Sequence, residues 1–295
     1  MREVPSATEL QLHGFTRALV GSPLDDRGKA AIAHLLSIGL ATSELTYRSD
    51  SFQLSLDGTV TDADDVDSLY AVLKNESLIL EATTLGIAEL LLMSRAAKRG
   101  GAAKLAFLYV EPLRYVGRTR GDLLHRRDFE LTEEFLGFKS IPEFVINLAD
   151  PRPSRGVFFL GYEERRLDRA FEDHQMINGD NCTVVFGVPG FSPGWEMNSF
   201  SRNLRIIRDK GVRPEVAFCG AENPQAAYGL LHRVSSSLKT DERMFVAPLG
   251  TKPNGIGVAL FCATHSNIGV LYDHPRRKPG RTESVTQWHL YEAVF

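Results

Sequence analysis

Short apolar runs alternate with amphipathic segments along most of this chain. An apolar run of about four to eight residues is typical of a strand buried on both faces, and apolar residues spaced three or four apart indicate a helix. The segment Met244–Tyr272 shows both patterns, because an apolar run, a turn, an amphipathic stretch and a second apolar run follow one another. We interpret it as strand, turn, helix and strand, with Pro253 at the first helical position.

The C-terminal half repeats this order several times. Strands are predicted at Gly156–Leu160, Cys182–Val188, Glu215–Cys219, Met244–Ala247, Ile268–Tyr272 and Gln287–Phe295. Helices are predicted between them at Glu163–His174, after Ser192-Pro193 and after Asn223-Pro224, where a capping side chain precedes a proline. Strands that alternate with helices indicate a parallel sheet with helical crossovers.

The N-terminal half gives a similar but less regular pattern. Strands are predicted within Leu10–Val20 and at Glu44–Tyr47, Ser51–Leu56, Ser77–Ala82 and Ala102–Tyr109. Helices are predicted to open at Asp25, at Thr61, which has the spacing of a capping box with Asp64, and at Thr83-Thr84. The order again favours a parallel sheet.

The Pro-rich segment at 150–154 predicts a boundary between two halves. The N-terminal half then covers residues 1–150, with an irregular basic segment at 111–150, and the C-terminal half covers residues 151–295. The expected fold is α/β and Rossmann-like, with mostly parallel sheets and helices on both faces. The pattern leaves open whether the halves share one sheet.

Composition excludes several classes of protein. The 295 residues are 43% hydrophobic and 24% charged, which is typical of a soluble globular protein. The net charge of −3 gives no support for a general nucleic-acid surface. No apolar run approaches the roughly 20 residues of a membrane helix, and the N-terminus lacks the apolar core of a secretory signal. Three cysteines lie far apart in apolar runs, so we expect a cytoplasmic protein with reduced, buried thiols and no metal site.

The strongest chemical signal is the turn Gly250-Thr251-Lys252, which with Asn254 leads into the predicted helix. A helix N-terminus exposes unpaired N–H groups and a partial positive charge, and Lys252 adds a full charge. These four residues are therefore expected to bind a phosphate or carboxylate. The alternative is an ordinary capped turn with an exposed lysine.

Ligands of open α/β sheets bind outside the carboxyl ends of the strands. Thr83 and Thr84 follow one predicted strand, and Gly161 and Tyr162 follow another. We expect these four residues to orient a ligand, with Tyr162 near a ribose or base. N-capping by the threonines and a tight turn at Gly161 are the alternatives.

Three carboxylates also follow predicted strands and are the candidates for acid/base catalysis: Glu163, Glu111 and Asp273. Each has a simpler interpretation. Glu163 would complement a helix dipole, and Asp273, next to His274, would lie in a solvated turn. No cofactor is indicated.

Two basic segments remain, Arg114–Arg127 and Arg276–Arg281. Either could contact a phosphate-bearing ligand or a partner, although solvated loops are the commoner explanation. The Walker motif, GxSxG and GxGxxG are all absent from the sequence, so no nucleotide-binding or hydrolase signature decides the function.

Five segments carry a resemblance to known proteins: ILEATTLG (79–86), LYVEPLRY (108–115), FFLGYEERR (158–166), PLGTKPNGIG (248–257) and VLYDHPRR (270–277). In these segments the chain resembles an uncharacterised family of bacterial Rossmann-like proteins loosely associated with defence islands or mobile elements. The resemblance implies a Rossmann-type module, and it supplies no activity. The outline is also similar to the cyclic-nucleotide sensors of prokaryotic immunity, which pair two Rossmann-like halves.

Three functions follow from these patterns. The first is a sensor or accessory module that binds a nucleotide or other phosphorylated small molecule and is read by a partner protein or a second copy of the chain. The second is an enzyme that acts on a nucleotide or nucleoside through one of the three carboxylates. The third is a structural subunit of a larger complex.

Overall fold

The structure, a computed structural model, describes residues 1–118, 128–129, 131–150 and 152–295. The fold is α/β, and the chain forms two compact units. Unit 1 consists of Met1–Val116 with Arg277–Phe295, and unit 2 of Gly117–Arg276. Among the described residues, no helix is both long and apolar enough to cross a membrane.

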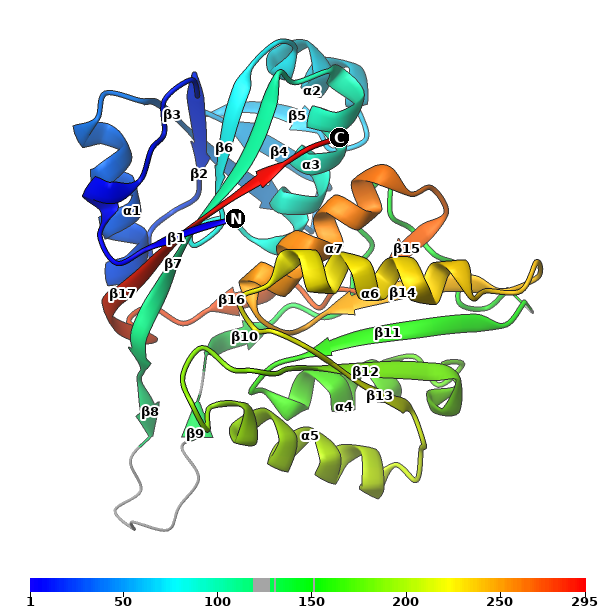
Figure 1. Cartoon of the computed structure of the whole chain (residues 1–295). Helices are drawn as coiled ribbons and strands as arrows, with labels where there is room; N and C mark the ends of the chain where they lie inside the picture. Colours follow the sequence, from blue (N-terminus) through cyan, green and yellow to red (C-terminus); the bar gives the residue numbers. More distant parts are fainter. Residues whose placement is uncertain (119–127, 130, 151) are drawn as a thin grey trace. The chain divides into compact units, whose positions relative to one another are not determined.

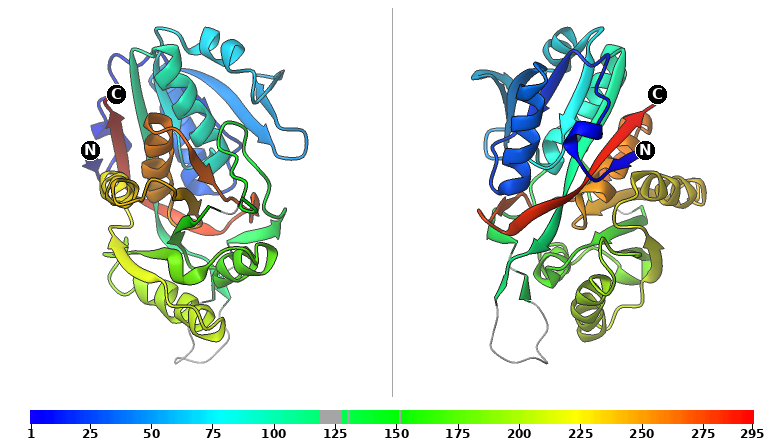
Figure 2. Two further views of the ribbon diagram at one scale, coloured as in Figure 1. Left: turned by 90° about the vertical axis from the view of Figure 1, so that its right-hand side faces the viewer. Right: turned by 60° about the vertical axis from the view of Figure 1, so that its left-hand side comes forward.

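This grouping differs from the division at 150/151 that the sequence suggests. The last strand, β17 (Thr282–Ala293), belongs to unit 1 because it pairs antiparallel with β7 (Lys104–Tyr115) over most of its length. Figure 2 shows β17, in red, running beside β7. A proline-rich segment indicates a local break in secondary structure, whereas the pairing of β17 with β7 joins residues far apart in the sequence.

Unit 1 contains an eight-stranded sheet. Its strand order is β1 (Arg2–Val4), β17, β7, β6 (Ser77–Glu81), β2 (Arg17–Val20), β3 (Ala41–Arg48), β4 (Gln53–Leu56) and β5 (Thr59–Asp62). The inner strands β7, β6, β2 and β3 are parallel, and the strands outside them pair antiparallel. The sheet is therefore mixed, and the expectation of a mostly parallel sheet holds only for its centre.

The helices of unit 1 begin where capping groups are available. Asp25 caps α1 (Asp26–Ser37) by accepting a hydrogen bond from the Gly28 amide, as expected. Asp65 caps α2 (Val66–Leu73), while Thr61 lies in β5, so the expected capping box at Thr61 is wrong.

The third helix of unit 1, α3 (Ile87–Gly100), also begins later than expected. Its N-cap is Gly86, so the prediction that Thr83-Thr84 open it is wrong. The two threonines instead form a buried turn after β6.

Unit 2 contains a five-stranded parallel sheet. Its strand order is β13 (Glu215–Cys219), β12 (Cys182–Gly187), β11 (Ser154–Leu160), β14 (Arg243–Pro248) and β15 (Ile268–Val270). Four helices connect the strands: α4 (Glu164–Asp173), α5 (Glu196–Asp209), α6 (Pro224–Ser236) and α7 (Lys252–Thr264). In Figure 1, α4 and α5 cover one face of this sheet, and α6 and α7 cover the other.

Helix starts in unit 2 confirm two of the three proline signals. Asn223 and Thr251 each accept a hydrogen bond from an amide of the helix they cap, and each precedes a proline in the first turn. Ser192-Pro193 does not open α5, whose first residue is Glu196. Short pieces complete the chain: η1 (Ala7–Glu9), β8 (Gly117–Arg118), β9 (Asp128–Phe129), β10 (Thr132–Phe135), η2 (Gly179–Asn181) and β16 (Pro275–Arg277).

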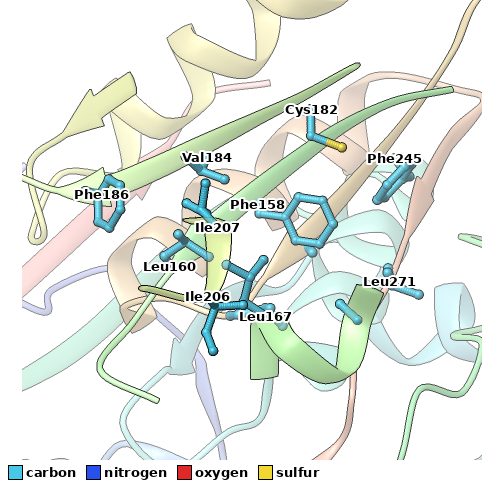
Figure 3. Packing of buried hydrophobic residues seen from close by; sticks show 13 residues of the cluster. Phe158, Leu160, Leu167, Cys182, Val184, Phe186, Ile206, Ile207, Phe245 and Leu271 are labelled. Carbon is cyan, nitrogen blue, oxygen red and sulfur yellow. The ribbon is translucent and has the colours of Figure 1, made fainter. Parts of the chain in front are cut away.

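One hydrophobic core of unit 2 lies between the sheet and the α4–α5 pair. Phe158 and Phe186 from the strands pack with Leu167 of α4 and Ile207 of α5 (Figure 3). Burying each such side chain contributes about 1.5–3 kcal/mol. Gly156 is required in β11, because an added Cβ would lie 2.5 Å from the ring of Phe245. In the register of the sheet, Gly156 lies opposite Phe245 of β14, so the glycine leaves room for this ring at the centre of the sheet.

Candidate functional site

The carboxyl ends of the unit 2 strands run into glycines. Gly161, Gly187, Gly220 and Gly250 follow or end β11, β12, β13 and β14 in turn. An added Cβ on Gly161 would lie 2.8 Å from the carbonyl oxygen of Leu249, and one on Gly250 would lie 3.2 Å from that of Leu160. The loops after β11 and β14 therefore touch backbone to backbone, and glycine permits the approach.

The strand order reverses at this place. The chain adds β12 and β13 on one side of β11, and then β14 and β15 on the other. Crevices at such a reversal are where open α/β sheets bind ligands. Gly161, Tyr162, Gly250 and Thr251 of the predicted site are brought together at this reversal.

The first turn of α7 is fixed by its own hydrogen bonds. The Thr251 hydroxyl donates to the carbonyl oxygen of Ala221 at 2.6 Å and accepts from the amide of Asn254 at 3.4 Å. The Asn254 side chain is buried and donates to the carbonyl oxygen of Gly220 at 3.0 Å. Asn254 therefore holds α7 against the loop after β13. Lys252 lies at the first residue of α7 and is half-buried.

Glu163 occupies the N-cap position of α4 and anchors another segment there. Its carboxylate accepts hydrogen bonds from the amides of Leu131 and Thr132 at 3.1 and 2.9 Å, and from the Thr132 hydroxyl at 2.8 Å. The carboxylate that the sequence suggests as a catalytic acid or base thus has three donors from β10 and the residue before it.

Asp273 is almost fully buried and faces Arg166 of α4. The Arg166 Nε donates to Oδ2 at 2.8 Å and Nη2 donates to Oδ1 at 2.5 Å, while Nη1 donates to the carbonyl oxygen of Leu249 at 2.9 Å. The expected solvated turn at Asp273 is therefore wrong. Arg166 was not among the residues predicted from the sequence, although it lies four residues before Ala170 on the inward face of α4.

The remaining three predicted residues belong to unit 1. Glu111 is buried, and its carboxylate lies 3.1 Å from Nε2 of His289, which is itself fully buried. Thr83 accepts a hydrogen bond from the amide of Val110 at 3.0 Å, and Thr84 accepts one from the amide of Gly21 at 2.8 Å. These hydroxyls join the turn after β6 to strand β7 and to the residue that directly follows β2.

Beneath the two threonines lies Glu81, which the sequence analysis did not single out. Its side chain is completely buried and accepts hydrogen bonds from the amides of Thr83 and Thr84 at 3.0 and 2.8 Å, and from the Thr84 hydroxyl. Burial raises the pKa of the Glu81 carboxyl, although these hydrogen bonds oppose the shift. The sequence pattern that could have identified Glu81 is a carboxylate within the apolar run of β6.

A cavity of about 500 Å³ lies at the opposite edge of the unit 2 sheet. It is near the amino ends of β14 and β15, and its polar lining includes Asn147, Arg152, Thr240, Arg243 and Asn267. None of the residues predicted for the site contributes to it. The sequence carried no signal for this cavity, because its walls come from loops that are distant along the chain.

The structure describes the two basic segments, Arg114–Arg127 and Arg276–Arg281, to different extents. Much of the first, residues 119–127, lies outside the described residues. In the second, Arg276 is exposed and pairs with Glu134 at 2.9 Å, whereas Arg281 is largely buried. The second segment is therefore not uniformly a solvated loop.

We compared the sequence with protein-family models and with curated proteins, and it matches none of them. The residues of this chain therefore carry the functional conclusion by themselves. They fall into two groups, with Thr83, Thr84 and Glu111 in unit 1 and the other predicted residues in unit 2.

Proposed function

We propose that the protein binds a nucleotide or another phosphorylated small molecule at the carboxyl edge of the unit 2 sheet. Unit 2 would act as a Rossmann-like module, and a partner protein or a second copy of the chain would read the bound state in a bacterial defence system. The observation that carries the proposal is the reversal of strand order between β11 and β14, directly beside the N-terminus of α7.

The phosphate would lie against the first turn of α7. Amides of a helix N-terminus that lack intrahelical partners favour an anion, and the dipole of α7 adds to the charge of Lys252. Tyr162, half-buried in the loop after β11, would contact the ribose or base. Gly161 and Gly250 let these two loops approach closely, so a small ligand could contact both.

Binding is favoured over catalysis because all three candidate carboxylates have internal partners. Asp273 pairs with Arg166, Glu163 accepts three hydrogen bonds, and Glu111 pairs with His289. A general base must reach the proton that it removes. In the enzymatic alternative, product formation from a nucleotide panel would be lost in Glu163→Gln while binding remained.

Thermal-shift measurements with a panel of nucleotides test the proposal. A ligand at about 100 times its Kd stabilises the folded state by about 2.7 kcal/mol, which raises Tm by several degrees. We expect such a shift in the wild type and in the control Lys239→Ala, which changes an exposed lysine of the same unit. Lys252→Ala should lose the shift. A panel without any stabilising nucleotide, or an equal shift in Lys252→Ala, would contradict the proposal.

A further inference from the structure

Three arginines of unit 1 lie near one another, and two of them, Arg27 and Arg281, approach the same carboxylate. Arg27, Arg277 and Arg281 come from two segments about 250 residues apart, and the carboxylate is that of Asp25. They lie beyond the carboxyl ends of β2 and β6, because Asp25 follows β2 and Arg277 contacts the turn after β6. We call these four residues the arginine cluster.

Arg27 is the arginine that balances Asp25. Its Nη2 donates to Oδ2 of Asp25 at 2.8 Å, and its Nε donates to the Thr282 hydroxyl at 3.1 Å. The Thr282 hydroxyl in turn donates to Asp25 at 2.7 Å. Burial alone would raise the pKa of Asp25, but Arg27 and the hydrogen bonds from Thr282 and Gly28 hold it below its usual range. Asp25 is therefore ionised, and its charge is already matched.

Arg277 is bound to the backbone instead of to a carboxylate. Its Nη1 donates to the carbonyl oxygen of Thr83 at 2.9 Å, and its Nη2 donates to that of Thr84. Carbonyl oxygens satisfy the donors of a guanidinium but carry no net charge. The positive charge of Arg277 is therefore not neutralised by these contacts.

Arg281 is the least satisfied member. Its side chain is 15% exposed, and its Nε lies 3.9 Å from Oδ2 of Asp25, beyond hydrogen-bond distance. Within the described part of the chain, that buried Nε has no hydrogen-bond partner. Burial, followed by repulsion from Arg277 and Arg27, lowers the pKa of Arg281 to about 10. It is still protonated at neutral pH.

The charges of the arginine cluster therefore do not balance. Three guanidinium groups and one carboxylate leave two positive charges in a largely buried place. An uncompensated buried charge is costly, and proteins keep one only where a partner or a function offsets it. A doubly charged anion beside Arg281 would neutralise the cluster.

We infer that the arginine cluster is a binding site for a phosphate dianion, contacted by Arg281 and neutralising Arg277. A guanidinium presents parallel N–H donors that match two phosphate oxygens, which is the geometry that favours arginine over lysine. Inorganic phosphate and the terminal group of a phosphomonoester share this chemistry. The inference is independent of the proposed function, because it concerns unit 1 and none of the residues around α7.

The test uses the full chain in a buffer free of phosphate and sulfate. Tm is measured against increasing inorganic phosphate or glycerol 3-phosphate, for the wild type, Arg281→Gln and Arg114→Gln. Arg114 is the control because it is an exposed arginine of β7 that pairs with Glu283. We expect both anions to raise Tm of the wild type and of Arg114→Gln. The probe that acts at lower concentration identifies whether the site takes the free ion or a phosphomonoester.

In Arg281→Gln, the apparent affinity for the better probe should fall about tenfold or more, because charge-assisted hydrogen bonds are lost. Without any anion, this variant should be at least as stable as the wild type, because an excess buried charge has been removed. If Arg281 served only to stabilise the fold, its replacement would instead make the protein less stable in the absence of an anion. Lower stability of Arg281→Gln in phosphate-free buffer, an undiminished response to both probes in this variant, or a wild type that responds to neither would overturn the inference.

Discussion

The Arg166 guanidinium lies against both carboxylate oxygens of Asp273, 107 residues further along the chain, with Nε 2.8 Å from Oδ2. Only 9% of the Arg166 side chain and 2% of the Asp273 side chain are exposed. Because Arg166 also donates to the backbone of the loop after β14, the pair joins α4, that loop and the segment after β15.

Asp273→Asn should therefore destabilise the protein strongly. Breaking a buried pair leaves an uncompensated charge and costs about 3–5 kcal/mol. The free energy of unfolding in urea measures the loss. Asp209→Asn is the control, since Asp209 pairs with Arg208 at the surface, and it should change stability by less than about 0.5 kcal/mol. Equal stability of the two variants would show that the buried pair is not needed.

Glu163→Ala should release the segment that Glu163 holds. Its carboxylate accepts from the amides of Leu131 and Thr132, so hydrogen exchange at these two amides should become faster. The control Glu133→Ala changes an exposed carboxylate of the same strand and should leave both rates as they are. Unchanged exchange in Glu163→Ala would mean that other contacts position β10.

Cys182 and Cys219 should react slowly with iodoacetamide in the folded protein. Burial raises the pKa of the Cys182 thiol to about 12 and that of Cys219 to about 11. The thiolate is the reactive form, so native alkylation at pH 8 should be at least about a hundredfold slower than in unfolded protein. Mass spectrometry of time points measures both rates, and similar rates would contradict the burial of these thiols.

The same shift predicts how stability changes at high pH. The folded-state pKa of each thiol lies above the ordinary 9.0, so the folded state binds these protons more tightly than the unfolded state. Their contribution to stability is fully present below pH 9.0 and is lost as the pH rises toward 11 and 12. Cys182→Ser should show less of this loss than the wild type.

Glu81→Gln should change the pH dependence of stability at acid pH. Burial raises the pKa of Glu81 above its ordinary 4.5, so its contribution is full below that pH and is lost as the pH rises through the folded value. Urea denaturation between pH 4 and 7 should show this decline in the wild type but not in Glu81→Gln. Glu3→Gln, an exposed control in β1, should retain it. A decline of equal size in Glu81→Gln would assign it to other groups.

Local pattern predicted the part of the fold that depends on neighbours in sequence. The strand and helix order of unit 2 follows from apolar spacing, and the caps at Asn223 and Thr251 follow from a polar side chain before a proline. Ser192-Pro193 shows the same pattern but does not cap a helix. The helix α5 begins only at Glu196, with Trp195 as its N-cap, after another turn of the chain. A capping pair therefore marks where a helix can begin without requiring it to.

The pairings of the site could not be predicted, because they join residues far apart. From the sequence, Asp273 has the pattern of a turn residue, and only the structure shows Arg166 beside it. Likewise, Arg281 has the pattern of a solvated arginine, and only the structure brings Arg27 and Arg277 near it. A run of charged residues in the sequence shows only which charges are present. Whether each side chain is buried, and which charge lies beside it, depends on how the sheet brings distant segments together. Glu81 was the exception, since a carboxylate inside a buried strand could have been recognised.

The antiparallel pairing of β17 with β7 sets the order in which the protein can mature on the ribosome. Unit 2 is continuous from residue 117 to residue 276 and can fold as soon as it has emerged. Unit 1 must wait for β17, because β1 reaches the sheet only through that strand. Unit 1, which begins the chain, is therefore completed after unit 2, and until then the edge of β7 that pairs with β17 is uncovered.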